Sequence, residues 1–241
     1  MKQLCLISIS LFFLNCYSQT SQLYLGTYTK ENSKGIYQLN FNTETGELSD
    51  LKLAIHTDNP SFLAYSPDRK YLYSTNGSES GFISSYKIQN DGSLFLLTRV
   101  SSMGTGPCHI SINKEGSKVA VSNYRGGTFA IYPVNKDGSL AEASQMFDHN
   151  IKEREAHTHA ALFFNDELFV ADLGRNALYQ YILENDAYKL KSDAIIKTKG
   201  NPGPRHFKLT KDGKFIYLIN EYGATITTIK RTKKGFKEID E

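Results

Sequence analysis

Four short segments of similar sequence recur along this chain at nearly equal intervals, and this repeat limits the fold more than any other feature. Their first residues lie 47, 50 and 47 residues apart. The segments cover residues 60–65, 107–112, 157–162 and 204–209. A period of this length is typical of one β-propeller blade, which takes roughly 40–50 residues. The repeat therefore predicts an array of propeller blades.

Each repeat has the same internal order of strands and turns. An inner strand is followed by a polar turn, a second strand, a third strand, a turn such as Asp91-Gly92, and a fourth strand. β-Branched and aromatic residues bounded by such turns predict hairpins, and no segment has a useful helical period. The second strands are expected at 71–75, 119–122, 168–171 and 215–219, the third at 82–88, 128–134, 177–183 and 225–230, and the fourth near Leu94, Leu140, Leu190 and Phe236.

A β-sandwich is the competing all-β fold, but a sandwich does not need one four-strand unit repeated in register, and a propeller does. The sequence therefore predicts an all-β fold, a β-propeller of four-stranded antiparallel blades. Residues 24–28, 36–41 and 48–55 fit strands two to four of a further unit. That unit lacks an innermost strand, which in a closed propeller would come from the C-terminal end. About five blades' worth is expected, and an unpaired blade edge predicts self-association.

The N-terminal residues have a different pattern. Lys2 precedes an apolar stretch at 4–14, and short polar residues follow it. This order predicts a signal peptide over residues 1–19, with the propeller at 20–241 and export to the periplasm or the outside. Attachment of lipid at Cys16 is less favoured, because Asn15 is a poor small residue before such a cysteine. The apolar stretch is too short to span a bilayer as a helix, so no membrane span is expected.

Charge and cysteine content exclude several classes of function. The net charge is +3 and the basic residues are scattered, which disfavours nucleic-acid binding. Cys108 would be the only cysteine of the processed chain, so no internal disulfide is expected. The Cys and His spacings fit no zinc site, and no acidic cluster suggests another ion. No metal and no cofactor are therefore expected.

The register of the repeat points to a site at the mouth of the central channel, because the first strand of each blade lines that channel. The second positions of the four segments are Ser61, Cys108, Thr158 and Arg205, and the third are Phe62, His109, His159 and His206. His157, two residues before His159, is expected on the same face. Glu221 follows the second strand of the Arg205 unit and should approach Arg205. For His109, an ordinary hydrogen-bonded polar residue is the competing interpretation.

Several runs of this sequence resemble those of the seven-bladed propeller lactonases, a family that includes propeller-type 6-phosphogluconolactonase and carboxy-muconate cyclase. The runs are Gly106-Pro107-Cys108-His109, Asn123-Tyr124-Arg125-Gly126-Gly127, His157-Thr158-His159, Ala171-Asp172-Leu173-Gly174, Gly203-Pro204-Arg205-His206-Phe207 and Asn220-Glu221. The resemblance implies a lactone hydrolase that converts 6-phosphogluconolactone to 6-phosphogluconate. It also implies a site at His157, His159, Arg205, His206 and Glu221. The role implied by the family would place the protein in the cytoplasm.

Lactone hydrolysis requires an activated water and a stabilised oxyanion. Glu221 is the candidate base, and Arg205 with His157 or His159 would stabilise the oxyanion. His206, His109 and Tyr124 are candidates for binding the substrate. Two alternatives stay open: a non-catalytic ligand-binding or scaffold propeller, and a lactonase for a different extracytoplasmic lactone. The strand-end residues Asn76, Asn123, Asp172 and Asn220 are interpreted as structural groups that close turns.

Overall fold

The computed structural model describes residues 20–77, 80–191, 195–198 and 200–240. The predicted signal peptide at 1–19 lies outside these residues. Within them the chain forms β-strands joined by turns, without any helix. Accordingly, the described part of the chain has no helix long and apolar enough to cross a membrane.

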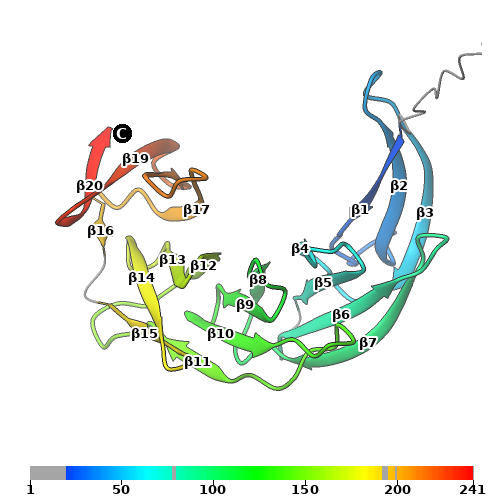
Figure 1. Cartoon of the computed structure of the whole chain (residues 1–241), viewed down its shortest axis with the longest axis horizontal. Helices are drawn as coiled ribbons and strands as arrows, with labels where there is room; N and C mark the ends of the chain where they lie inside the picture. The colour runs from blue at the N-terminus through cyan, green and yellow to red at the C-terminus, as the bar shows by residue number, and fades with distance from the viewer. Residues whose placement is uncertain (1–19, 78–79, 192–194, 199, 241) are drawn as a thin grey trace, which may run out of the picture.

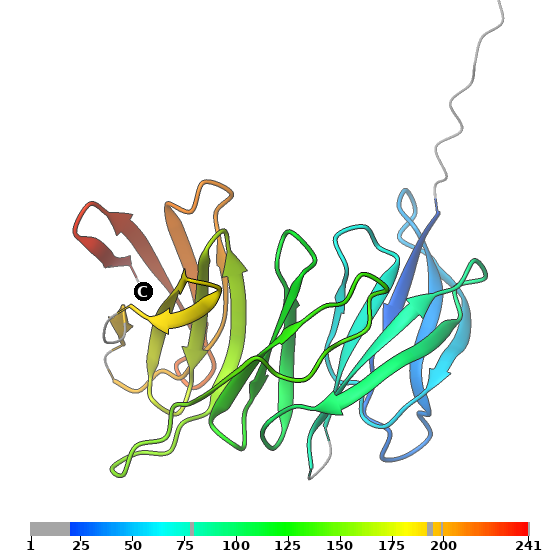
Figure 2. The ribbon, with the colours of Figure 1, turned by 60° about the horizontal axis from the view of Figure 1, so that its bottom comes forward.

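Five antiparallel sheets follow one another along the chain. Figure 1 shows them around an arc, with the first sheet in blue at one end and the last in red at the other. The view in Figure 2 shows the same sheets standing side by side. All but the first have four or more strands, so the predicted propeller architecture is confirmed.

The strands of the first sheet are β1 (Thr20–Leu25), β2 (Gly35–Asn42) and β3 (Leu48–His56). The second contains β4 (Leu63–Tyr65), β5 (Tyr71–Asn76), β6 (Phe82–Ile88) and β7 (Leu94–Ser101). The third contains β8 (Pro107–Ile112), β9 (Lys118–Asn123), β10 (Thr128–Pro133) and β11 (Gln145–Asp148). The fourth contains β12 (Thr158–Phe164), β13 (Glu167–Asp172), β14 (Ala177–Glu184), β15 (Ala187–Leu190) and β16 (Ile196–Lys197). The fifth contains β17 (Pro204–Leu209), β18 (Phe215–Asn220), β19 (Thr225–Thr232) and β20 (Gly235–Asp240).

Two predicted outer strands differ from the structure. In the fourth sheet, β15 ends at Leu190 instead of beginning there, because Asn185 and Asp186 (φ 51° and 63°) turn the chain back at once. A two-residue turn with positive φ at both positions joins adjacent strands directly. In the third sheet, the backbone amide of Leu140 donates to Thr98 Oγ1 of the second sheet (2.9 Å), and the regular outer strand β11 starts only later.

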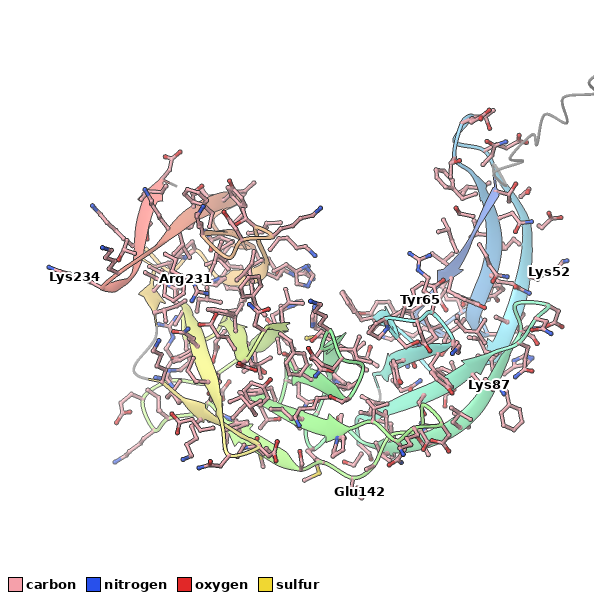
Figure 3. The ribbon with its side chains drawn as sticks, in the orientation of Figure 1. Lys52, Tyr65, Lys87, Glu142, Arg231 and Lys234 are labelled. Atoms are coloured by element: carbon pink, nitrogen blue, oxygen red, sulfur yellow. The ribbon has the colours of Figure 1, made fainter. Side chains whose placement is uncertain are left out.

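The hydrophobic core is divided among the spaces between neighbouring sheets, which side chains fill in Figure 3. Phe129 and Ile131 of the third sheet pack with Val170 of the fourth, for example. Arg231, labelled in Figure 3, adds a polar link. Its guanidinium on β19 donates to both carboxylate oxygens of Glu167 on β13, at 2.9 and 2.6 Å. Each sheet is thus fixed against the next, and the inner strands are held side by side.

Candidate active site

The inner strands β8, β12 and β17 each carry a β-bulge close to their first residue. In β8 the pairing with β9 shifts between Pro107 and His109, so that Cys108 is the extra residue. The same shift occurs around His159 in β12 and around Arg205 in β17. A bulge leaves its extra residue outside the ladder and re-aims that side chain. Three blades therefore present one side chain each from an equivalent bulge.

This register corrects the predicted alignment of the third repeat by one residue. His159 corresponds to Cys108 and Arg205, and Ala160 corresponds to His109 and His206. The alignment matched histidine with histidine, but strand pairing places Ala160 opposite Ala171. A one-residue slip normally moves a side chain to the other face of a strand. His159 still points into the site, because it occupies the bulge.

A cavity of about 780 Å³ opens where these bulges and the loops after the second strands meet. It brings together residues from all five sheets: Tyr28, Lys30, Asn59, Ser61, Phe62, Gly77, Gly106, Pro107, Cys108, Tyr124, Arg125, His159, Arg205, His206 and Glu221. Five of the seven predicted site residues line it. His157 and His109 do not.

Arg205 and Glu221 form an ion pair at the cavity, through Arg205 Nε and Glu221 Oε2. The expected approach of these two side chains is therefore confirmed. It follows from the hairpin, because Arg205 lies on the bulge of β17 and Glu221 directly follows β18, its partner strand. Both side chains are 41% exposed, so a small molecule in the cavity can reach them.

Three imidazole rings form a row beside this ion pair. The ring centroids of His159 and His206 are 4.8 Å apart, and those of His206 and His109 are 5.7 Å apart. Burial, followed by the nearby Arg205 and His206, lowers the pKa of His159 to about 3. Burial, followed by Arg205, also lowers the pKa of His206. Both rings are therefore neutral near pH 7 and can donate one hydrogen bond and accept another.

The buried ring nitrogens His159 Nδ1 and His206 Nε2 have no hydrogen-bond partner among the described residues. Buried polar atoms are normally paired, so these two nitrogens depart from the usual pattern, as does Nδ1 of the neighbouring His109. The described residues contain no group of three or more His, Cys, Asp or Glu side chains that could hold a metal ion.

His109 lies behind the cavity wall. Its side chain is 4% exposed, and its ring packs 4.4 Å from that of Phe62, which does line the cavity. Burial, with His206 and His159 nearby, lowers the pKa of His109 to about 3. The structure therefore gives His109 no direct contact with a bound substrate. His109 instead packs against the rings of Phe62 and His206 and supports them.

His157 also lies outside the lining, because β12 begins one residue later. Its ring stacks on that of Tyr124 at 4.7 Å, and its Nδ1 lies 3.0 Å from the carbonyl oxygen of Tyr124. Tyr124 lines the cavity, and its hydroxyl lies 3.5 Å from that of Tyr222. This hydrogen bond, followed by burial, raises the pKa of Tyr124 to about 12. His157 thus holds Tyr124, which in turn faces the cavity.

The thiol of Cys108 lines the cavity but is not activated. Burial raises its pKa to about 12, although the nearby Arg205 lowers it somewhat. The thiolate is the nucleophilic form of cysteine. Cys108 therefore stays protonated near pH 7 and is not a nucleophile in this site.

A buried hydrogen-bond network, which the sequence did not predict, lies next to the site. His149 Nδ1 lies 2.9 Å from Asp172 Oδ2, and His149 Nε2 lies 2.6 Å from the hydroxyl of Tyr181. The other carboxylate oxygen, Asp172 Oδ1, accepts the backbone amide of His157 at 2.9 Å. Asp172 was expected to be structural, and it fixes the backbone of the residue on which Tyr124 stacks. The available signal was that Asp172 is the single acid among the four strand-end residues, since the other three are asparagines.

The neutral buried histidines predict loss of stability in acid. The native state holds His109 at a pKa of about 3, whereas the ordinary value is 6.5. The unfolded chain therefore binds the proton first as the pH falls below about 6.5, and stability decreases until about pH 3. We expect His109→Phe to reduce this slope by roughly 1 kcal/mol per pH unit. Urea unfolding at pH 7.5, 6 and 5 measures it.

The matched control is His56→Gln, at a histidine that is exposed. It should leave the pH slope as in the parent chain. If His109→Phe also leaves the slope unchanged, His109 takes up its proton in the native state, contrary to the buried neutral ring described above.

Comparison with known proteins agrees with this geometry. Residues 22–241 match the family described as "Lactonase, 7-bladed beta-propeller". A 6-phosphogluconolactonase of Formosa agariphila is 35% identical over 85% of this chain, and one of Bacillus subtilis is 32% identical over 90%. The alignments span 63% and 64% of these two relatives, somewhat less than two thirds of their length.

Solved structures give the same result. A putative 6-phosphogluconolactonase of Bacteroides fragilis has a TM-score of 0.82 and 32% identity, covering 92% of this chain and 67% of its own. The periplasmic gluconolactonase of Pseudomonas aeruginosa has a TM-score of 0.84 and 26% identity, with the same two coverages. The bulged inner strands, the cavity they surround and the match over residues 22–241 lead to one conclusion: this chain belongs to the seven-bladed β-propeller lactonase family.

Proposed function

We propose that this protein hydrolyses a sugar lactone, with 6-phosphogluconolactone to 6-phosphogluconate as the reaction. The observation that carries the proposal is the Arg205–Glu221 ion pair, which lies in an open cavity beside two neutral imidazoles. The names of the relatives support the same class of substrate. No cofactor takes part in the proposed reaction.

The proposed reaction uses a carboxylate, a guanidinium and one imidazole. Glu221 accepts a proton from water as the water oxygen attacks the lactone carbonyl carbon. The carbonyl oxygen becomes an oxyanion, which N–H groups of Arg205 and His159 stabilise. The tetrahedral intermediate then collapses, the bond from the carbonyl carbon to the ring oxygen breaks, and that oxygen takes the proton from Glu221. The product is the open-chain hydroxy acid.

The substrate's other groups are assigned to the remaining walls of the cavity. His206 and the hydroxyl of Tyr124 are assigned to hydrogen-bond sugar hydroxyls, because both residues line the cavity. His109 and His157 act through these neighbours rather than on the substrate.

Titration at constant pH tests the proposal. We expect proton release from 6-phosphogluconolactone well above the spontaneous rate, and loss of that excess in Glu221→Gln, which keeps the size of the side chain. Release at the spontaneous rate from both 6-phosphogluconolactone and glucono-lactone would favour the second class, a non-catalytic ligand-binding propeller.

We further propose that the N-terminal residues direct export. Lys2 and the apolar stretch at 4–14 support this, and the structurally similar gluconolactonase of Pseudomonas aeruginosa is called periplasmic. An exported protein would meet lactones other than the cytosolic one, which keeps a different extracytoplasmic lactone as the alternative substrate. Fractionation of cells that express the full chain measures the location, and recovery only in the cytosol would contradict export.

Self-association is proposed through the outer faces of the first and last sheets, with a second copy of this chain as the partner. The second, third and fourth sheets each bury both of their faces against neighbouring sheets. Tyr217 and Ile219 on β18 and Leu23 and Leu25 on β1 are instead large, apolar and exposed. Such side chains on the first and last sheets suit a head-to-tail contact. Sedimentation over a range of concentrations measures it, and a monomer throughout would contradict it.

A further inference from the structure

The lining of the cavity carries more positive than negative charge. Lys30, Arg125 and Arg205 contribute three cations, and Glu221 contributes the one carboxylate. Arg205 is already paired with Glu221. Lys30 and Arg125 have no ion pair and no hydrogen bond from their side chains to any described residue. Two cations in a substrate cavity are therefore left without an internal counter-charge.

The loop that carries Arg125 is fixed on both sides of that residue. The backbone amide of Tyr124 donates to the carbonyl oxygen of Gly106 at 2.9 Å, and that of Gly126 donates to the carbonyl oxygen of Thr105 at 3.0 Å. The methylene stem of Arg125 crosses Gly106 so closely that a Cβ atom there would lie 3.0 Å from Arg125 Cγ. The stem of Arg125 thus packs beside Gly106, and Arg125 is an exposed residue at the cavity.

Lys30 comes from another sheet and is also next to a fixed backbone. The amide of Thr29 donates to Asn59 Oδ1 at 2.9 Å, and Asn59 Nδ2 donates to the carbonyl oxygen of Gly77 at 3.0 Å. Asn59 and Gly77 both line the cavity. The segment before β2 is therefore tied to the second sheet at the cavity edge, and Lys30 directly follows the tied residue.

The histidines of the site are poor partners for a negatively charged substituent, because burial keeps His159 and His206 neutral. Arginine is well suited to bind a phosphate group through two parallel N–H donors, and lysine adds a point charge. Among the substituents of a sugar, a phosphate ester gains most from binding an arginine and a lysine.

We propose that Arg125, together with Lys30, forms an anion subsite of the cavity that selects phosphorylated sugar lactones over neutral ones. The inference rests on the proposed function, since it assigns recognition of the phosphate to these two residues and leaves the lactone ring to Arg205 and Glu221. His206 and His109 take no part in phosphate recognition in this arrangement.

Binding of the reaction product tests the subsite without turnover. Calorimetry on the parent chain and on Arg125→Gln compares 6-phosphogluconate with gluconate. We expect the ratio of the two affinities to fall roughly tenfold to a hundredfold in Arg125→Gln, the usual effect of losing a charge-assisted hydrogen bond. Lys30→Gln should lower it less. Arg99→Gln is the matched control, because Arg99 packs over Phe82 outside this cavity.

The outcomes separate the subsite from the reaction. Loss of phosphate preference in Arg125→Gln, in a chain that hydrolyses neither lactone, supports the subsite and removes the proposed reaction. Hydrolysis of 6-phosphogluconolactone with a preference that neither Arg125→Gln nor Lys30→Gln changes overturns the subsite and keeps the reaction. Equal affinity of the parent chain for 6-phosphogluconate and gluconate also overturns the subsite.

Discussion

Arg205→Ala is expected to lower the turnover of 6-phosphogluconolactone at least about a hundredfold while leaving the fold intact, because a fixed donor to an oxyanion contributes on this scale in other enzymes. The guanidinium lies in the cavity and holds the Glu221 carboxylate, so its loss removes a donor and frees the base. Steady-state kinetics measure the effect. We expect it mainly in kcat rather than KM, since the oxyanion exists only in the transition state and the intermediate.

Two variants control this experiment. Arg205→Lys keeps the charge but loses the planar donor geometry, and should recover only part of the turnover. Arg99→Ala removes an arginine outside the cavity and should leave kinetics and fold unchanged. Turnover of Arg205→Ala equal to that of the parent chain would remove Arg205 from the mechanism.

Asp172→Ala is expected to destabilise the protein by about 3–5 kcal/mol, because three groups lose a hydrogen-bond acceptor whose absence costs roughly 1–3 kcal/mol each. The side chain of Asp172 is fully buried. One oxygen accepts the amides of His157 and Arg175 at 2.9 and 2.8 Å, and the other lies 2.9 Å from His149. Truncation leaves the buried His149 ring and the two part-buried amides without this partner. The free energy of unfolding in urea measures the loss.

Asp172→Asn is the matched control for this prediction. The other blades carry Asn76, Asn123 and Asn220 at the equivalent strand end, so the amide fits this position. It keeps one acceptor oxygen for the two amides and should cost clearly less than alanine. An unfolding free energy of Asp172→Ala within experimental error of the parent chain would mean that the network adds nothing to stability.

The repeat was sufficient to predict the fold, because a propeller repeats one unit and each unit carries its own turns. The same regularity placed Arg205 near Glu221, since both belong to one hairpin. Equal spacing could not reveal the one-residue slip at His159, which depends on which residues pair across β12 and β13. A bulge inserts a residue without any sequence signal as clear as glycine in a tight turn.

Contacts between blades were harder to predict than contacts within one. His149 directly follows β11 of the third sheet and Asp172 ends β13 of the fourth, and only the packing of those sheets brings them to 2.9 Å. His157 was expected to face the cavity with His159, but β12 starts after His157, so strand alternation does not apply to it. The ion pair between Arg231 and Glu167 is similarly hard to predict from sequence. Opposite charges are common along the chain, and this pair forms only because β19 lies beside β13.

The bulges on the inner strands have a consequence for how this family can change. Cys108, His159 and Arg205 occupy one equivalent place in three blades, yet they differ in size, charge and chemistry. Because the extra residue of a bulge contributes little to the ladder, its side chain can be exchanged with little disturbance to the sheet. A different functional group can therefore occupy these positions while the propeller fold stays the same. Grafting a new side chain there is the most direct way to give this scaffold a different reactivity.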